Sequence, residues 1–164
     1  MKKLLVLFLL ISSTAYAQQT KYNIESLRGL KGVNVVVEDL QPNIEADGLG
    51  RDSIQADVEL ELRLAGIRVL TEEERLKEPG CPYLYVNVNS YKDSTISIYG
   101  FSISVELKQD VILMRYLQTV VYGATTWYTS RVGIVRAQMV DDIIDFVKDD
   151  VDKFINDYLS VNPR

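Results

Sequence analysis

Histidine is absent from the whole chain of 164 residues. Its absence removes the side chain that most often acts as a general base near neutral pH, and the commonest transition-metal ligand. Ser-His and Cys-His nucleophile pairs are therefore excluded, and neither a Gly-x-Ser-x-Gly nor a Ser-x-x-Lys motif occurs. We predict no catalytic, metal-binding or cofactor-binding residues and no cofactor, which argues against an enzyme.

Cysteine is nearly as scarce, because Cys81 is the only one. A single cysteine cannot form an internal disulfide, so the hydrophobic core has to stabilise the fold alone. Cys81 lies in the loop Pro79-Gly80-Cys81-Pro82. Two roles remain open for it, a plain loop or half-buried thiol and a bridge to another chain.

Basic residues are also fewer than acidic ones. The 18 Lys and Arg residues face 23 Asp and Glu residues, which gives a formal net charge of −5. A negative protein has no overall electrostatic attraction for nucleic acid or for anionic lipid. We therefore expect no nucleic-acid partner.

One long apolar run stands at the start of the chain. Two lysines precede the eight residues Leu4–Ile11, and Ala15-Tyr16-Ala17 then forms a small-x-small site before Gln18. This order is typical of a secretory signal peptide, and eight residues are far fewer than the ~20 that span a bilayer as a helix. Residues 1–17 are predicted to be a signal peptide, cleaved between Ala17 and Gln18. The protein is then periplasmic or secreted, without a stable membrane anchor.

The rest of the chain has the length of one ordinary domain. Residues 18–30 are polar and mixed, and we expect an N-terminal tail there, followed by a single α/β domain over residues 31–162. The run Gly32–Val37 is apolar on nearly every residue, which predicts a central strand. Residues 41–52 contain a proline and two glycines and are predicted to form a loop.

The segment 51–66 fits two structures. Part of it alternates like a strand, but Ile54, Val58 and Leu62 also fall on one helical face. Asp52 or Ser53 as an N-cap and Gly66 as the C-terminal glycine favour a helix. We predict a helix, and a hairpin remains the alternative.

The middle of the chain is predicted to be sheet. A short strand at 67–70 precedes a helix whose start carries the capping-box spacing of Thr71 and Glu74. Further strands are expected over 83–89, 95–107, 111–116 and 118–129. The alternation changes parity around Gly100, which predicts a β-bulge there.

Residues 137–159 carry the clearest helical pattern. Apolar side chains recur every three or four residues, and seven aspartates are expected on the solvated remainder, Asp150 among them. The predicted fold class is α/β (α+β). It has a single mixed β-sheet with helices packed on one face, and a long amphipathic C-terminal helix.

Aromatic residues gather in the sheet region. Tyr91, Tyr99, Trp127 and Tyr128 lie near predicted strand ends or beside polar residues, and are the candidates for a partner-binding surface. The competing interpretation is that these rings fill the core between sheet and helix.

Three segments carry a family resemblance, namely Gly29–Val33, Leu64–Leu70 and Pro82–Val88. They resemble a family of small, exported bacterial proteins without an assigned activity. The α/β domain of this family is similar to the N-terminal domain of the Tol-Pal component TolB and to the curli-secretion lipoprotein. The resemblance runs from about Gly29 to Asn162 and implies a fold, with no catalytic residues attached to it.

These observations favour an exported, non-catalytic binding or assembly-accessory module of the bacterial envelope, with another envelope protein as its partner. Two alternatives remain. A carboxylate-dependent hydrolase would need two acids that meet in space. A small-ligand carrier would need a closed apolar cavity.

The leader gives a direct prediction. After expression in an exporting bacterial host, N-terminal sequencing and intact-mass measurement of the recovered protein should place its first residue at Gln18. Recovery of a chain that still begins at Met1 would contradict the signal peptide.

Overall fold

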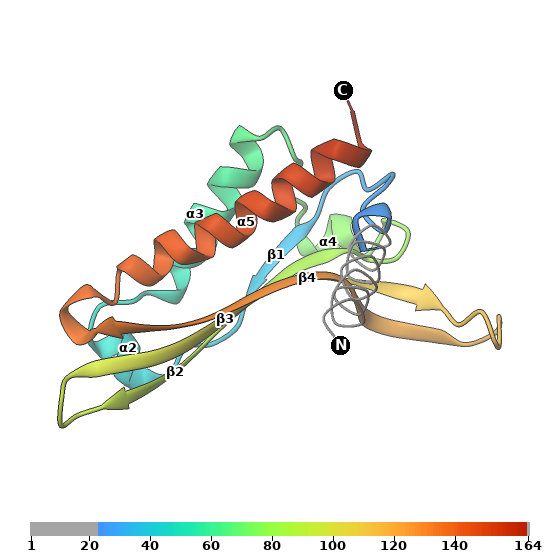
Figure 1. Cartoon of the computed structure of the whole chain (residues 1–164). Helices are drawn as coiled ribbons and strands as arrows, with labels where there is room; N and C mark the ends of the chain where they lie inside the picture. Colours follow the sequence, from blue (N-terminus) through green and yellow to red (C-terminus); the bar gives the residue numbers. More distant parts are fainter. Residues whose placement is uncertain (1–22, 164) are drawn as a thin grey trace, which may run out of the picture.

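A computed structural model of the protein describes residues 23–163 and contains one four-stranded sheet in the order β1-β2-β3-β4. The strands are β1 (Asn34–Val37), β2 (Tyr83–Asp93), β3 (Ile98–Ile112) and β4 (Val120–Arg136). β1 runs parallel to β2, and the other neighbours are antiparallel. The predicted single mixed sheet is confirmed (Figure 1).

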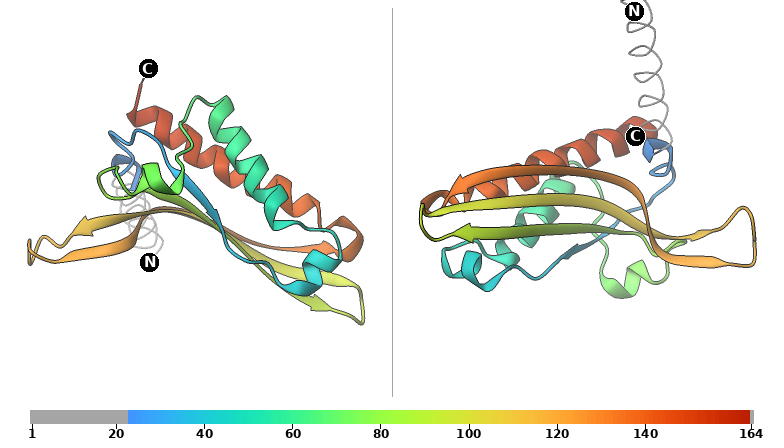
Figure 2. Two further views of the ribbon diagram at one scale, coloured as in Figure 1. Left: turned by 180° about the vertical axis from the view of Figure 1, so that it is seen from behind. Right: turned by 60° about the horizontal axis from the view of Figure 1, so that its bottom comes forward.

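Two long helices, α3 (Arg51–Leu64) and α5 (Asp142–Val161), lie together on one face of this sheet (Figures 1 and 2). Three short helices, α2 (Pro42–Ala46), α4 (Glu72–Arg75) and the 3₁₀ turn η1 (Ala137–Met139), connect the larger elements. The predicted α/β class with a long C-terminal helix is confirmed. No helix within residues 23–163 is both long and apolar enough to cross a membrane.

The core forms between the sheet and these two helices, because alternate strand residues point toward the helices. The strands contribute residues such as Leu84, Val86 and Ile103, all at most 1% exposed. The predicted stripe of α5 meets them, with Val151 and Phe154 completely buried. Burial of these side chains is the main source of stability, at about 25 cal/mol per Å² of apolar surface.

The predicted helix over 51–66 is confirmed as α3, but its N-cap was predicted wrongly. The cap is Gly50, with no side-chain hydrogen bond, and Asp52 lies inside the first turn. There its charge favours the positive end of the helix dipole. Gly66 follows the helix with φ +73°, the left-handed conformation expected of a C-terminal glycine. The capping box of Thr71 and Glu74 is also confirmed.

β1 is an edge strand, which corrects the expectation of a central one. Val35 and Val37 face the core, and Val36 on the other face borders Glu72 and Arg75 of α4. Residues 67–70 cover the edge at Val33, just before β1, where Val33 and Val69 form a single parallel bridge. The Val33 amide donates to the Arg68 carbonyl at 3.0 Å, and the Leu70 amide donates to the Val33 carbonyl at 2.8 Å. The strand predicted at 67–70 is reduced to that bridge, and the expected loop over 41–52 contains α2.

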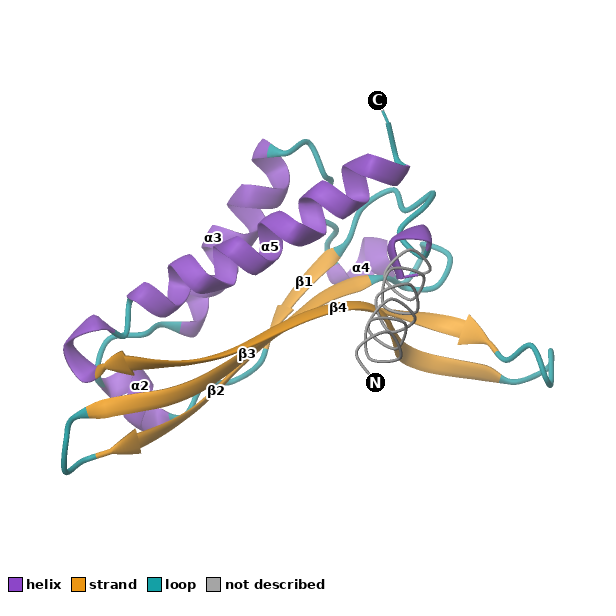
Figure 3. Cartoon of the chain, in the orientation of Figure 1, coloured by secondary structure: helices purple, strands orange, loops and turns teal. Residues whose placement is uncertain are grey.

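The bulge predicted at Gly100 is wrong. Pairing is regular there, and the parity change only reflects Ile98 pointing to the uncovered face while Tyr99 points into the core. The register instead shifts between Leu107 and Lys108 and between Gln109 and Val111. Beyond these shifts, β3 and β4 continue as a hairpin over residues 109–124, hereafter the arm, which leaves the body (Figure 3).

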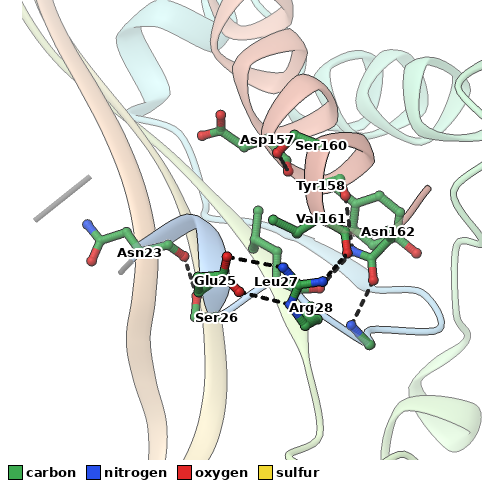
Figure 4. A network of polar contacts seen from close by, with 11 residues as sticks. Asn23, Glu25, Ser26, Leu27, Arg28, Asp157, Tyr158, Ser160, Val161 and Asn162 are labelled. Carbon is green, nitrogen blue, oxygen red and sulfur yellow. Dashed lines mark hydrogen bonds and ion pairs between the residues drawn. The ribbon is translucent and has the colours of Figure 1, made fainter. Parts of the chain in front are cut away.

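The described part of the expected tail, residues 23–30, belongs to the folded body (Figure 4). Leu27 is fully buried, and the Asn162 side chain accepts from the Gly29 amide at 2.7 Å and donates to the Leu27 carbonyl at 2.9 Å. The Arg28 guanidinium donates to the Val161 carbonyl at 3.2 Å. The leader, its cleavage site at Ala17 and Gln18, and the rest of the tail lie outside the described residues.

One aspartate of α5 is not on the solvated side where it was expected. Asp150 is 0% exposed, and its carboxylate accepts hydrogen bonds from Arg131 of β4 at 2.7 Å and from Lys153 at 2.7 Å. A buried carboxylate persists only when it is paired and hydrogen-bonded. Arg131 provides that pairing from the strand beneath, so this contact fixes α5 against β4.

We expect Arg131→Met to lower the free energy of unfolding by about 3 kcal/mol, because it leaves a buried carboxylate with too few partners. Arg136→Met removes an exposed arginine from the same strand and should cost less than about 0.5 kcal/mol. Urea unfolding of both variants measures the difference. Equal losses would show that the Asp150 pair contributes nothing to stability.

Candidate functional site

The sheet face opposite α3 and α5 carries neither long helix, and we call it the open face (Figure 2). The short helix α4 reaches it at the start of β2, where the Arg75 guanidinium lies 5.3 Å from the Tyr83 ring centroid. Pairing aligns its side chains in rows across β2, β3 and β4. Asn87, Ser104 and Ser130 form one row in the middle of the sheet. These side chains are short and polar, so they project little from the middle of the open face and offer hydrogen-bonding groups.

Apolar side chains gather at the end of the open face nearest the β2–β3 turn. Tyr91, Val132 and Ile134, the apolar end cluster, are 76%, 86% and 73% exposed. Tyr91 and Ile134 lie in one row on either side of Gly100, which has no side chain to fill the space between them. A shallow hollow of about 350 Å³ results there.

The row at the other end of the open face contains Tyr85 and Glu106, and the polar groups of these two side chains are hydrogen-bonded within the protein. The Tyr85 hydroxyl donates to Glu38, and the Lys108 ammonium lies 4.4 Å from the Tyr85 ring centroid. Glu106, the neighbour of Tyr85 in the row, accepts from the Thr125 hydroxyl at 2.6 Å. The hydrogen bond to Glu38, followed by burial, raises the pKa of Tyr85 to about 12.

The structure separates the four aromatic residues predicted to bind a partner. Tyr91 and Tyr128 are on the open face, 76% and 61% exposed. Two rows lie between their rows, so they are six residues apart along the strands, or ~20 Å at ~3.3 Å per residue, and do not form one platform.

Tyr99 and Trp127 are 0% and 3% exposed and cannot contribute a contact surface, which corrects their inclusion among the candidates. The Tyr99 hydroxyl donates to the Asp47 carboxylate at 2.8 Å. The Trp127 indole donates to Asp157 at 2.8 Å and packs edge-on against Phe154, with ring centroids 5.3 Å apart. The competing interpretation of core filling is correct for these two.

Sequence reasoning missed Val132 and Ile134, although a signal was present. Their strand has apolar residues at both parities, since Trp127 and Val135 face the core. When helices cover only one face of a sheet, every second residue of a strand points to the other face and is exposed. The arm was missed as well. Its exposed apolar residues are Ile112, Met114, Tyr116, Leu117, Val120, Val121 and Tyr122.

No group of three or more Cys, Asp or Glu side chains within residues 23–163 is placed to hold a metal ion. A hollow of about 690 Å³ lies beside Cys81 at the base of the arm and is open to solvent. Its carboxylates already have partners, since Glu72 binds Arg75 and Asp110 accepts from the Gly123 amide at 2.9 Å.

Comparisons with protein-family models, with curated proteins and with solved structures found no match to this chain.

The raised pKa of Tyr85 gives a pH-dependent prediction. Because its folded pKa lies above the ordinary value of about 10, its contribution to stability is complete below that pH and is lost as the pH rises toward about 12. The phenolate absorbance after a rapid pH jump should show a step near pH 12 that Tyr85→Phe removes. Glu38→Gln should move that step toward 10. A step that stays near 12 in the Glu38 variant would contradict the assigned cause.

Proposed function

We propose that this protein is an exported, non-catalytic binding module that docks against another protein of the bacterial envelope through its open face. The apolar end cluster carries this proposal. Three large apolar side chains are exposed in two neighbouring rows of one sheet face, and the β-branched Val132 and Ile134 have few rotamers to lose when a partner covers them. Burying each of them is worth about 1.5–3 kcal/mol.

The remainder of the open face suits the same role. Protein interfaces combine an apolar centre with a polar rim that supplies hydrogen bonds. The apolar end cluster would form the centre, and the rows of serine and asparagine beside it would form the rim. The partner should therefore present a flat surface with an apolar patch rather than a narrow projection.

The envelope location is supported by the N-terminal pattern of residues 1–17 and by the resemblance of Gly29–Val33 and its companion segments to exported bacterial proteins. The two alternatives receive no comparable support. A hydrolase would need free carboxylates in a pocket, whereas Glu38 and Glu106 both have hydrogen-bond donors and line no described hollow. A carrier would need a closed cavity, whereas the described hollows are open.

A photocrosslinking amino acid at position 132 tests this function in intact exporting cells. We expect one dominant envelope protein to be captured, because Val132 is the most exposed residue of the apolar end cluster. The same amino acid at position 60, on the outer side of α3, is the matched control, since Leu60 is also exposed at 52%. The captured band should disappear when Ile134→Asp is added to the position-132 protein.

Equal capture from positions 132 and 60 would contradict the proposal, as would only background proteins at native expression. Thermal unfolding of the Ile134→Asp variant should match the parent because the side chain is exposed. This measurement separates a lost surface from a lost fold.

A further inference from the structure

The arm, residues 109–124, carries an exposed apolar surface that is separate from the open face. Its end is the most exposed: Met114 is 94% exposed, Leu117 71% and Tyr116 60%. Figure 1 shows the arm leaving the body at the end opposite the β2–β3 turn, with no described helix over it. Large apolar side chains gathered at a protruding point mark a surface made for contact.

The arm is built to hold this end in place. At its base, the Asp110 amide donates to the Gly80 carbonyl at 2.7 Å, and the Gln109 side chain donates to the Thr126 hydroxyl at 2.8 Å. At its end, the Leu113 amide donates to the Thr119 carbonyl at 3.1 Å. The exposed side chains are therefore presented on an ordered turn.

Charge is distributed unevenly around this end. The chain has 23 acidic residues, yet residues 111–140 contain none. Arg115 is the only ionisable side chain apart from tyrosine between residues 111 and 124, and it is exposed. The end of the arm therefore combines leucine, methionine and tyrosine with one positive charge, in a protein that is negative overall.

We propose that the end of the arm, centred on Met114 and Leu117, docks onto the surface of a lipid bilayer. A fluid bilayer deforms around a convex apolar end and so covers it without a preformed pocket, and the end of the arm carries no acidic side chain that anionic lipid phosphates would repel. Leucine and methionine would enter the upper acyl region, and Tyr116 would sit at the headgroup level, where amphipathic rings are favoured. Arg115 can extend to lipid phosphate, and no carboxylate of the arm's end opposes insertion.

Docking of this kind is peripheral and reversible, because few side chains enter the lipid. It is driven by apolar burial and does not require an anionic membrane, which agrees with the negative net charge. The proposal is independent of the proposed function, since the open face and the arm share none of the residues that carry the two arguments.

Partitioning onto vesicles of pure phosphatidylcholine tests this proposal. The protein should be recovered from the periplasm of an exporting host and its N-terminus sequenced, because an uncleaved leader would bind lipid by itself. We expect the protein to cosediment with the vesicles, and Met114→Ser with Leu117→Ser to lower the partition coefficient about ten-fold or more.

The matched control is Val132→Ser with Ile134→Ser, which removes equally exposed apolar groups from the open face. It should leave partitioning within about two-fold of the parent protein. A second readout is the emission of tryptophan placed at position 117, which should be quenched by brominated phosphatidylcholine. Trp127 is a suitable background because it is buried at 3% exposure.

Three results would overturn the proposal. The first is no cosedimentation of the parent protein. The second is an equal loss in the arm and open-face variants, which would indicate unspecific apolar adhesion. The third is self-association that the arm variant abolishes, without lipid binding, which would make the arm a contact between copies of the chain.

Discussion

The contact between Asp150 and Arg131 sets how the layers of this protein lie on one another. α5 is the longest helix of the described chain. Where it packs on β4, the carboxylate of its residue Asp150 is completely buried. That carboxylate is stabilised by Lys153 of its own helix and by the Arg131 guanidinium of β4, each at 2.7 Å, and the second contact joins the helix to the strand beneath. Apolar packing has no preferred direction, whereas the ion pair also requires its two charged groups to meet. The pair therefore selects the alignment in which Phe154 meets Trp127.

α3 packs beside α5 and against β1, so both long helices lie on the same face and the opposite face is left open to solvent over most of its area. A sheet whose two faces were both covered would need apolar side chains at both parities of its strands. In the middle rows, β2 and β3 carry asparagine and serine on the open side, so they can remain in water. β4 departs from this rule at Val132 and Ile134, whose exposure has no explanation within the described chain. An exposed apolar cluster that the fold does not require is best explained by a contact outside the fold.

Much of the fold was predictable because its signals are local. The stripe of α5, the capping box at Thr71 and the glycine after α3 depend on neighbouring residues, and each was identified correctly. The errors depend on contacts between distant residues. β1 resembles a central strand because Val36, on the face away from the core, borders α4. Asp150 resembles a surface aspartate because its partner Arg131 is on another element. The burial of Tyr99 and Trp127 depends on hydrogen bonds to Asp47 and Asp157, which spacing along the chain does not reveal.

β4 connects the two exposed surfaces and also keeps them apart. The apolar end cluster lies near its C-terminal end and the arm near its N-terminal end, with polar rows between them. The register shifts at Leu107 and Gln109 then turn the arm out of the body of the sheet. One partner surface would have to bend to cover both regions. Two independent contacts, one flat and one at a protruding end, therefore fit the geometry of this strand better than a single extended interface.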